Sequence, residues 1–248
     1  MPTIRLVVID IDGCLTPGEA QSWDFSVLQF VAEFNRKARA DTRQFAVTLC
    51  TGRQEPYVEA MMQAIDAHAP GIYENGGGLY FPAQYRFVEN PAITPVQRAM
   101  LAEVRRVLTR EIVEPGLGQF QPGKEVSLTL YPARAGVTFL QLADVAHRAL
   151  DGKISGLTIM PLVTSVDIVL DGIDKGAGVE WLSRETDIPI AQIAGIGDSS
   201  GDLPFLRRVG FSAAPVNATD DVKDAVQYVS PFEDGKAVVD ILQRWMKT

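Results

Sequence analysis

The stretch that decides the fold is Ile4-Arg5-Leu6-Val7-Val8-Ile9-Asp10-Ile11-Asp12-Gly13. Its apolar part, ending at Ile9, predicts a strand buried on both faces, as in a parallel sheet. Because alternate residues of a strand share a face, Asp10 and Asp12 leave the sheet side by side, at the edge where open α/β sheets bind ligands. Two adjacent carboxylates repel each other unless a cation or a shared proton intervenes. The pair therefore indicates a divalent metal and carboxylate chemistry.

Strand and helix patterns alternate on both sides of this strand. Near the N-terminus the expected strands are 4–9, 45–50 and 72–73, and the expected helices are 25–34 and 56–67. The pattern returns near the C-terminus, with helices expected at 176–185, 203–208, 220–225 and 236–246 and strands at 192–196, 211–213 and 228–229. This order predicts an α/β fold with a Rossmann-like, doubly wound parallel sheet.

The middle of the chain breaks the alternation. A strand-like segment at 79–87 contains Pro82, and a Gly/Pro-rich stretch at 115–123 predicts a loop. Helices are expected at 95–112 and 139–150, and strands at 126–131, 157–162 and 165–170. We therefore expect an inserted α+β domain at 81–168, within a core formed by 1–80 and 169–248.

Four polar segments stand where expected strands end or helices begin. They are Asp10-Ile11-Asp12-Gly13, Thr51-Gly52-Arg53, Lys175, and Gly197-Asp198-Ser199-Ser200-Gly201-Asp202. Singly, each has an ordinary explanation, such as a helix cap or a solvated charge. Together they supply four carboxylates for a hard cation such as Mg²⁺, and a hydroxyl, amides and an ammonium for phosphoryl oxygens. A carboxylate aimed at phosphorus could act as the nucleophile.

In this order the segments resemble the motifs of the haloacid dehalogenase-like (HAD) phosphohydrolases. The end of the chain, with Asn217 in Pro215-Val216-Asn217 and Gly235 in Glu233-Asp234-Gly235, is similar to the subgroup with a large type-2 cap. That subgroup includes Cof-like sugar phosphatases and sucrose-phosphate and phosphoglycolate phosphatases. The long interval between Thr51 and Lys175 leaves room for such a cap, whereas the interval between Asp12 and Thr51 does not.

The resemblance implies a role for each matching residue. Asp10 would be the nucleophile that forms an aspartyl-phosphate, and Asp12 the general acid and base. Mg²⁺ would be held by Asp10, by the Asp12 main-chain carbonyl and by Asp198, with support from Asp202. The phosphoryl group would be bound by residues that include Asp12 and Lys175, which also pairs with Asp10. The further phosphate-binding residues would be Gly13, Thr51, Gly52 and Asn217.

Two residues depart from the family pattern. Cys14 stands where the first motif usually has Thr, and Gly201 where the fourth usually has Asn or another polar residue. Neither is a required carboxylate, so we expect altered local hydrogen bonding and not a loss of activity.

Composition limits the classes of molecule that are expected to bind the chain. The chain of 248 residues has a formal net charge of −8 and no basic run, so nucleic acid and anionic membranes are not expected to bind. Neither a signal peptide nor an apolar stretch of about 20 residues is visible, which predicts a cytoplasmic protein. Cys14 and Cys50 are the only cysteines and are expected to be free thiols.

The leading hypothesis is a Mg²⁺-dependent phosphatase of a small phosphorylated metabolite, either a sugar phosphate or a phosphoglycolate-like acid. A sugar phosphomutase shares the chemistry, and a binding or regulatory module without turnover is an alternative of another class. A haloacid dehalogenase is disfavoured because Asp12 would have no role. The sequence does not choose the substrate, and fold-level analogy cannot do so either.

Overall fold

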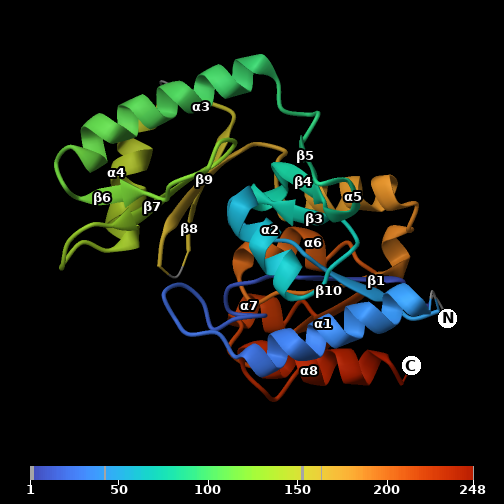
Figure 1. Ribbon diagram of the computed structural model, residues 1–248. Helices are drawn as coiled ribbons and strands as arrows, with labels where there is room; N and C mark the ends of the chain where they lie inside the picture. The colour runs from blue at the N-terminus through green and yellow to red at the C-terminus, as the bar shows by residue number, and fades with distance from the viewer. Residues whose placement is uncertain (1–2, 42, 152–153, 163, 248) are drawn as a thin grey trace. The chain divides into compact units, whose positions relative to one another are not determined.

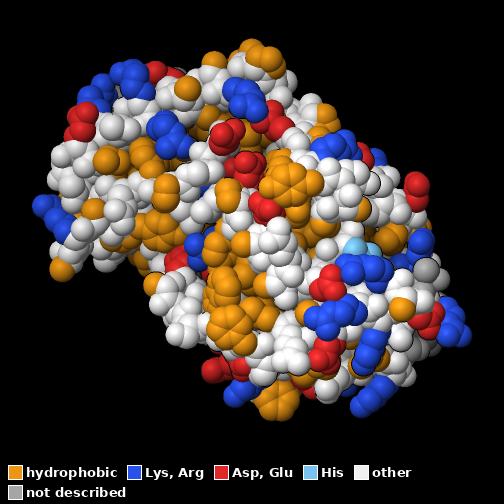
Figure 2. All heavy atoms as spheres, viewed as in Figure 1, with side chains coloured by type: hydrophobic (Ala, Val, Ile, Leu, Met, Phe, Trp, Pro, Cys, Tyr) orange, Lys and Arg blue, Asp and Glu red, His pale blue; other side chains and the backbone are white. Residues whose placement is uncertain are grey.

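The computed structural model describes residues 3–41, 43–151, 154–162 and 164–247. The chain divides into two compact units, Met1–Val88 with Lys175–Thr248, and Glu89–Asp174. Among the described residues no helix combines the length and apolar character that a membrane crossing requires. On the face shown in Figure 2, basic side chains are interspersed with acidic ones.

The first unit is built on a parallel sheet with the strand order β12-β11-β10-β1-β2. Its strands are β1 (Leu6–Ile9), β2 (Ala46–Leu49), β10 (Ile193–Ile196), β11 (Phe211–Ala214) and β12 (Tyr228–Val229). Its helices are α1 (Phe25–Ala40), α2 (Glu55–Ala64), α5 (Lys175–Thr186), α6 (Leu203–Leu206), α7 (Asp220–Lys223) and α8 (Asp234–Trp245). The α/β fold with a parallel sheet is confirmed.

Helices cover both faces of this sheet because β1 is apolar on both sides. Val7 and Ile9 pack into a core with α1, α2 and α8, whereas Leu6 and Val8 pack into a second core with α5 and α6. Figure 1 shows α1 and α8 running side by side. Continued alternation along the strand turns Asp10 toward the side on which α5 begins.

A small antiparallel sheet, β3-β4-β5, follows α2. Its strands are β3 (Gly71–Tyr73), β4 (Gly78–Phe81) and β5 (Arg86–Glu89). We expected β3 to extend the parallel sheet, but it meets β2 through a single parallel bridge, Cys50 to Ile72. The expected strand at 79–87 is two strands, because Pro82 begins a 3-10 turn that separates them.

The second unit is an antiparallel sheet, β6-β7-β9-β8, with α3 and α4 packed on one face. Its elements are β6 (Gly118–Phe120), β7 (Leu128–Pro132), β8 (Leu157–Pro161), β9 (Val166–Leu170), α3 (Pro95–Leu108) and α4 (Phe139–Leu150). Both helices begin with a reciprocal capping box, Thr94 with Gln97 and Thr138 with Gln141. The loop expected at 115–123 was wrong in part, because β6 forms there by pairing with β7.

Candidate active site

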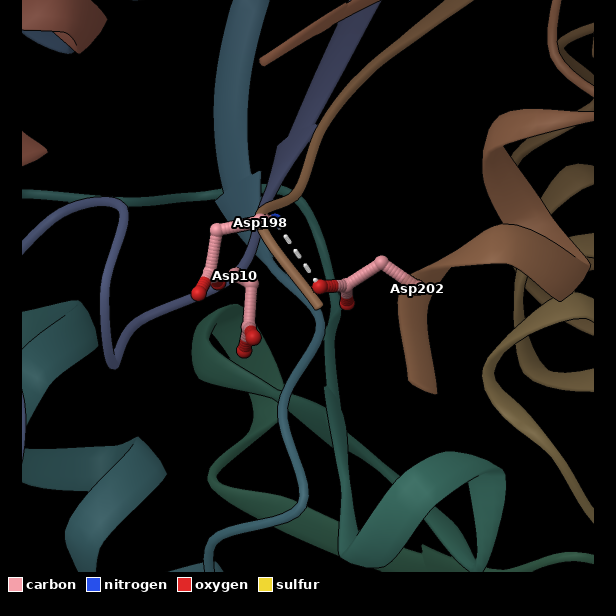
Figure 3. Close-up of side chains that lie close together, drawn as sticks. All are labelled: Asp10, Asp198 and Asp202. Carbon is pink, nitrogen blue, oxygen red and sulfur yellow. Dashed lines mark hydrogen bonds between the residues drawn. The ribbon is translucent and has the colours of Figure 1, made fainter. Parts of the chain in front are cut away.

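Three carboxylates converge at the carboxyl edge of the parallel sheet (Figure 3). Asp10 follows β1, Asp198 follows β10, and Asp202 lies in the 3-10 turn Ser200–Asp202. One oxygen of each lies within 4.8 Å of one oxygen of the others. The convergence follows from register, because β1 and β10 end together and the Asp10 amide donates to the Ile196 carbonyl at 3.0 Å.

Lys175, at the start of α5, brings an ammonium into this cluster. Its Nζ lies 2.9 Å from Asp10 Oδ2 and 2.6 Å from Asp202 Oδ1. Burial opposes the charged form of the lysine, but the two carboxylates outweigh it and raise the Lys175 pKa well above its ordinary range. One buried ammonium therefore faces three carboxylates.

The excess of negative charge changes the proton affinity of the carboxylates. Burial, followed by repulsion from Asp202, raises the pKa of Asp10 to about 7, although Lys175 acts against the rise. Burial, Asp202 and Asp10 likewise raise the pKa of Asp198 to about 8. A divalent cation would remove the repulsion, and an all-oxygen donor set suits a hard ion such as Mg²⁺. The three aspartates thus fit a metal site.

Asp202 also holds the loop that carries Asp198. Its Oδ2 accepts hydrogen bonds from the Asp198 and Ser199 amides, both at 3.0 Å, and from Ser199 Oγ at 3.2 Å. Its Oδ1 accepts from Lys175. Asp202 is completely buried, so its carboxylate fixes both the Asp198 loop and the lysine.

Asp12 lies outside the three-carboxylate cluster and is paired with Arg53. Arg53 Nε and Nη2 donate to the two Asp12 oxygens at 2.6 and 2.7 Å. The sequence motifs give Arg53 no role of its own. The only signal for it was its place after Thr51-Gly52, since 41 residues separate it from Asp12.

Thr51 and Gly52 follow β2, beside the first motif. The Cys50 amide donates to the Ile9 carbonyl at 2.9 Å, which brings the end of β2 next to Asp10. Thr51 Oγ1 accepts from the Arg53 amide at 3.1 Å and is buried. A β-carbon on Gly52 would lie 2.9 Å from the Asn75 side-chain oxygen, so the backbone is closely approached here.

Gly13 and Asn217 join the first loop to the end of the chain. Asn217 Nδ2 donates to the Gly13 carbonyl at 2.9 Å, and its Oδ1 accepts from the Asp234 amide at the same distance. Gly13 has φ of +81°, and a β-carbon there would lie 2.4 Å from Asp198 Oδ2. Only glycine fits this turn against Asp198.

The two departures from the family pattern differ in their surroundings. Cys14 Sγ donates to Asp198 Oδ1 at 3.5 Å and is fully buried. A β-carbon on Gly201 would meet only Ser199 Oγ, at 3.6 Å. Gly201 therefore leaves space that a polar side chain could fill, whereas Cys14 contacts the cluster itself.

Comparison with known proteins agrees with this architecture. Residues 158–242 match the family model of the haloacid dehalogenase-like hydrolases. A phosphoglycolate phosphatase of Thermoplasma volcanium is 26% identical over 246 residues, which cover 98% of each chain. Among solved structures, Thermoplasma acidophilum 0175 superposes with a TM-score of 0.75, 22% identity and coverage of 99% of this chain and 100% of that one.

A second solved structure, the HAD subclass IIB sugar phosphatase BT4131, has a TM-score of 0.65 and 18% identity, and the match covers 91% of this chain and 93% of that one. The parallel-sheet core, the family match and the full-length relatives lead to the same conclusion. They support a haloacid dehalogenase-like phosphohydrolase with a cap.

Proposed function

We propose that the chain is a Mg²⁺-dependent phosphatase of a small phosphorylated metabolite, with a phosphoglycolate-like acid as the first candidate and a sugar phosphate as the second. The observation that carries the metal and the chemistry is the cluster of the buried Asp10 and Asp202 and the half-buried Asp198 around Lys175. The first candidate substrate is supported by the full-length relative named phosphoglycolate phosphatase.

In the proposed reaction an Asp10 oxygen attacks phosphorus and the bond to the ester oxygen breaks. Asp12 gives its proton to the departing oxygen, which leaves as an alcohol. A water molecule then attacks the aspartyl-phosphate and gives a proton to Asp12. The bond between phosphorus and Asp10 breaks, inorganic phosphate leaves, and both carboxyl groups return to their starting forms.

The other residues would position the reacting groups. Lys175 orients Asp10 through their 2.9 Å contact and attracts the transferring phosphoryl group. Thr51, Gly52 and Gly13 would donate to phosphoryl oxygens from the neighbouring loops. Asn217 would act at the rim, where it fixes the Gly13 carbonyl.

Mg²⁺ would be held by Asp10, Asp198 and the Asp12 main-chain carbonyl, with Asp202 in support. When bound, it supplies positive charge opposite the developing phosphoryl charge. We propose that residues 81–168 include the cap that selects the leaving group, and that the enzyme acts in the cytoplasm.

Release of inorganic phosphate tests the proposal. The purified protein is given a panel with 2-phosphoglycolate, several sugar phosphates and one aryl phosphate, with Mg²⁺ and with a chelator. Release that requires Mg²⁺ is expected, and the preferred compound names the substrate class. If the folded protein releases phosphate from none of them, the phosphatase proposal is wrong. A sugar-phosphate isomerisation assay with a bisphosphate activator then detects a mutase.

A further inference from the structure

Arg53 is the charged residue of the site for which the proposed reaction gives no task. Its guanidinium makes a two-point contact with the Asp12 carboxylate, at 2.6 and 2.7 Å. The Arg53 side chain is 15% exposed and that of Asp12 is 27% exposed, so the pair is partly shielded but open to solutes. A planar guanidinium fork is the donor that best matches a carboxylate in geometry and charge.

The surroundings of Arg53 hold the guanidinium in place. It lies over the Tyr57 ring, 4.8 Å from the ring centroid, and Tyr57 packs edge-to-face against Trp23 at 6.2 Å. A second carboxylate, Glu19 Oε1, lies 3.8 Å from Arg53 Nη2. A carboxylate thus already approaches this edge of the guanidinium, at ion-pair distance.

The other cation of the site, Lys175, takes part in the proposed reaction itself. Lys175 contacts Asp10 and Asp202 and is buried, so it serves the nucleophile and the phosphoryl group. A substrate with a second negative charge needs a second cation beyond the ester oxygen. Asp12 protonates that oxygen in the proposed reaction, and Arg53 lies one hydrogen bond beyond Asp12.

We propose that Arg53 binds the carboxylate of the leaving group, on the edge that Glu19 now approaches. This inference rests on the proposed phosphatase function. In a 2-phospho acid, the carboxyl carbon is two bonds from the ester oxygen, which is within reach of a guanidinium hydrogen-bonded to Asp12. Arg53 is thus a specificity-determining residue for phosphorylated short-chain carboxylic acids, and the negative charge of Glu19 weakens binding of the same carboxylate.

A pair of substrates of equal length isolates this contact. 2-Phosphoglycolate carries the carboxylate, whereas 2-hydroxyethyl phosphate has a neutral hydroxymethyl group in its place. The measured quantity is the ratio of kcat/KM for the two compounds, in the full-length protein with Mg²⁺. The wild type is expected to favour phosphoglycolate. Arg53→Met should lower the ratio by about 10- to 100-fold, which is the usual effect of losing a charged hydrogen bond.

Two further variants sharpen the test. Arg53→Lys keeps the positive charge but lacks the planar two-point donor group, so its kcat/KM ratio should lie between those of the wild type and Arg53→Met. Glu19→Gln removes the competing charge and should raise the ratio a few-fold. A neutral substitution of Glu19 that lowers the ratio would contradict the arrangement, because it would mean that Glu19 helps to bind the substrate.

The outcomes separate this inference from the function on which it rests. A wild-type ratio near one overturns the inference. Equal losses of kcat/KM on both substrates in Arg53→Met also overturn it, because Arg53 would then only position Asp12. If the methionine variant does not fold, the same comparison is made with Arg53→Lys. If the wild type releases phosphate from neither compound nor from any sugar or aryl phosphate, the proposed function fails instead.

Discussion

Each unit of the molecule buries a lysine beside aspartate, but the charges balance in only one of them. In the second unit, the Lys124 ammonium donates to Thr129 Oγ1, which donates to Asp167 Oδ1 at 2.6 Å. Lys124 Nζ and Asp167 Oδ1 are 3.9 Å apart. In these contacts of the described residues, one cation thus faces one anion through a shared hydroxyl.

The first unit places one ammonium against three carboxylates, Asp10, Asp198 and Asp202. In a balanced buried pair each charge is neutralised by the other, so the pair is compatible with a purely structural role. An excess of buried charge raises the free energy of the folded state until a proton or a cation neutralises it. The surplus carboxylates are therefore the feature on which we base the proposed reactive site. Substitutions in the two clusters should then have opposite effects on stability.

The largest effect is expected from Asp10→Asn. The amide keeps the shape of the carboxylate but is a poor nucleophile, so phosphate release should fall by roughly 10⁴-fold or more. Because the variant also removes one of the repelling charges, its stability in chelator should equal or exceed that of the wild type. Phosphate release and urea unfolding measure the two quantities on one sample. Activity above about one hundredth of wild type would contradict the covalent mechanism.

Asp198→Ala should cost about 10³-fold in activity, the scale of a lost electrostatic contact in a preorganised site. It should also abolish the rise in melting temperature on adding Mg²⁺, because a main metal ligand is gone. The matched control is Asp220→Ala, an aspartate whose side chain is 98% exposed. Mg²⁺ stabilisation that survives in Asp198→Ala would mean that the cation binds elsewhere.

In the balanced cluster, Asp167→Asn should reduce the free energy of unfolding by about 3–5 kcal/mol, because Lys124 loses its charged partner in a buried place. Urea unfolding in chelator gives the value. The double variant Lys124→Met with Asp167→Asn should recover part of the loss, since no buried charge remains. A loss below about 1 kcal/mol in Asp167→Asn would show that this cluster does not depend on its charge balance.

The comparison also explains what the sequence could predict. The site around Asp10 could be predicted from the sequence because several of its residues directly follow strands, and parallel strands end at one edge of the sheet. Thr51 and Asp198 follow such strands, and Lys175 stands where a helix begins. The Arg53–Asp12 and Lys124–Asp167 contacts carried no such local signal, because they join distant residues whose side chains meet only after packing. Roles for the site residues remain predictions.

Helices and strands, too, could be predicted where the signal is local and not where it depends on distant residues. Helices and strands with clear periodicity, such as α4 at Phe139–Leu150, were predicted at or near their bounds. Errors arose where pairing overrode local preference. β6 forms in a Gly/Pro-rich stretch because β7 supplies its hydrogen bonds, and β3 pairs with β4 more fully than with β2.

The pH dependence of stability in chelator tests the charge excess directly. Asp10 and Asp198 have folded-state pKa values of about 7 and about 8, above their ordinary 3.8, so between about pH 4 and 8 the folded protein binds more protons than the unfolded chain. The free energy of unfolding should therefore fall as pH rises, by at most about 1.4 kcal/mol per pH unit for each carboxyl.

Urea unfolding at pH 5.5, 7 and 8.5 measures this slope. Saturating Mg²⁺ should flatten it, because the cation replaces the protons, and the variant with both Asp10→Asn and Asp198→Asn should flatten it without metal. If stability in chelator does not fall across this range in the wild type, or falls equally in the variant, the two carboxyls do not have raised pKa values and the assignment of charge excess is wrong.

The smallest effect is expected from Cys14→Thr, which restores the residue usual in the family. Burial and the neighbouring Asp198 raise the pKa of the Cys14 thiol, so it remains a neutral donor to Asp198 Oδ1 across the range of the assay. A threonine hydroxyl can make the same contact at a shorter distance, and kcat/KM should change by less than about threefold. Cys14→Ala is the control, because it removes the donor and leaves Asp198 to the cation alone. A tenfold loss in Cys14→Thr that Cys14→Ala does not share would mean that the shape of the side chain, and not its hydrogen bond, sets the position of Asp198.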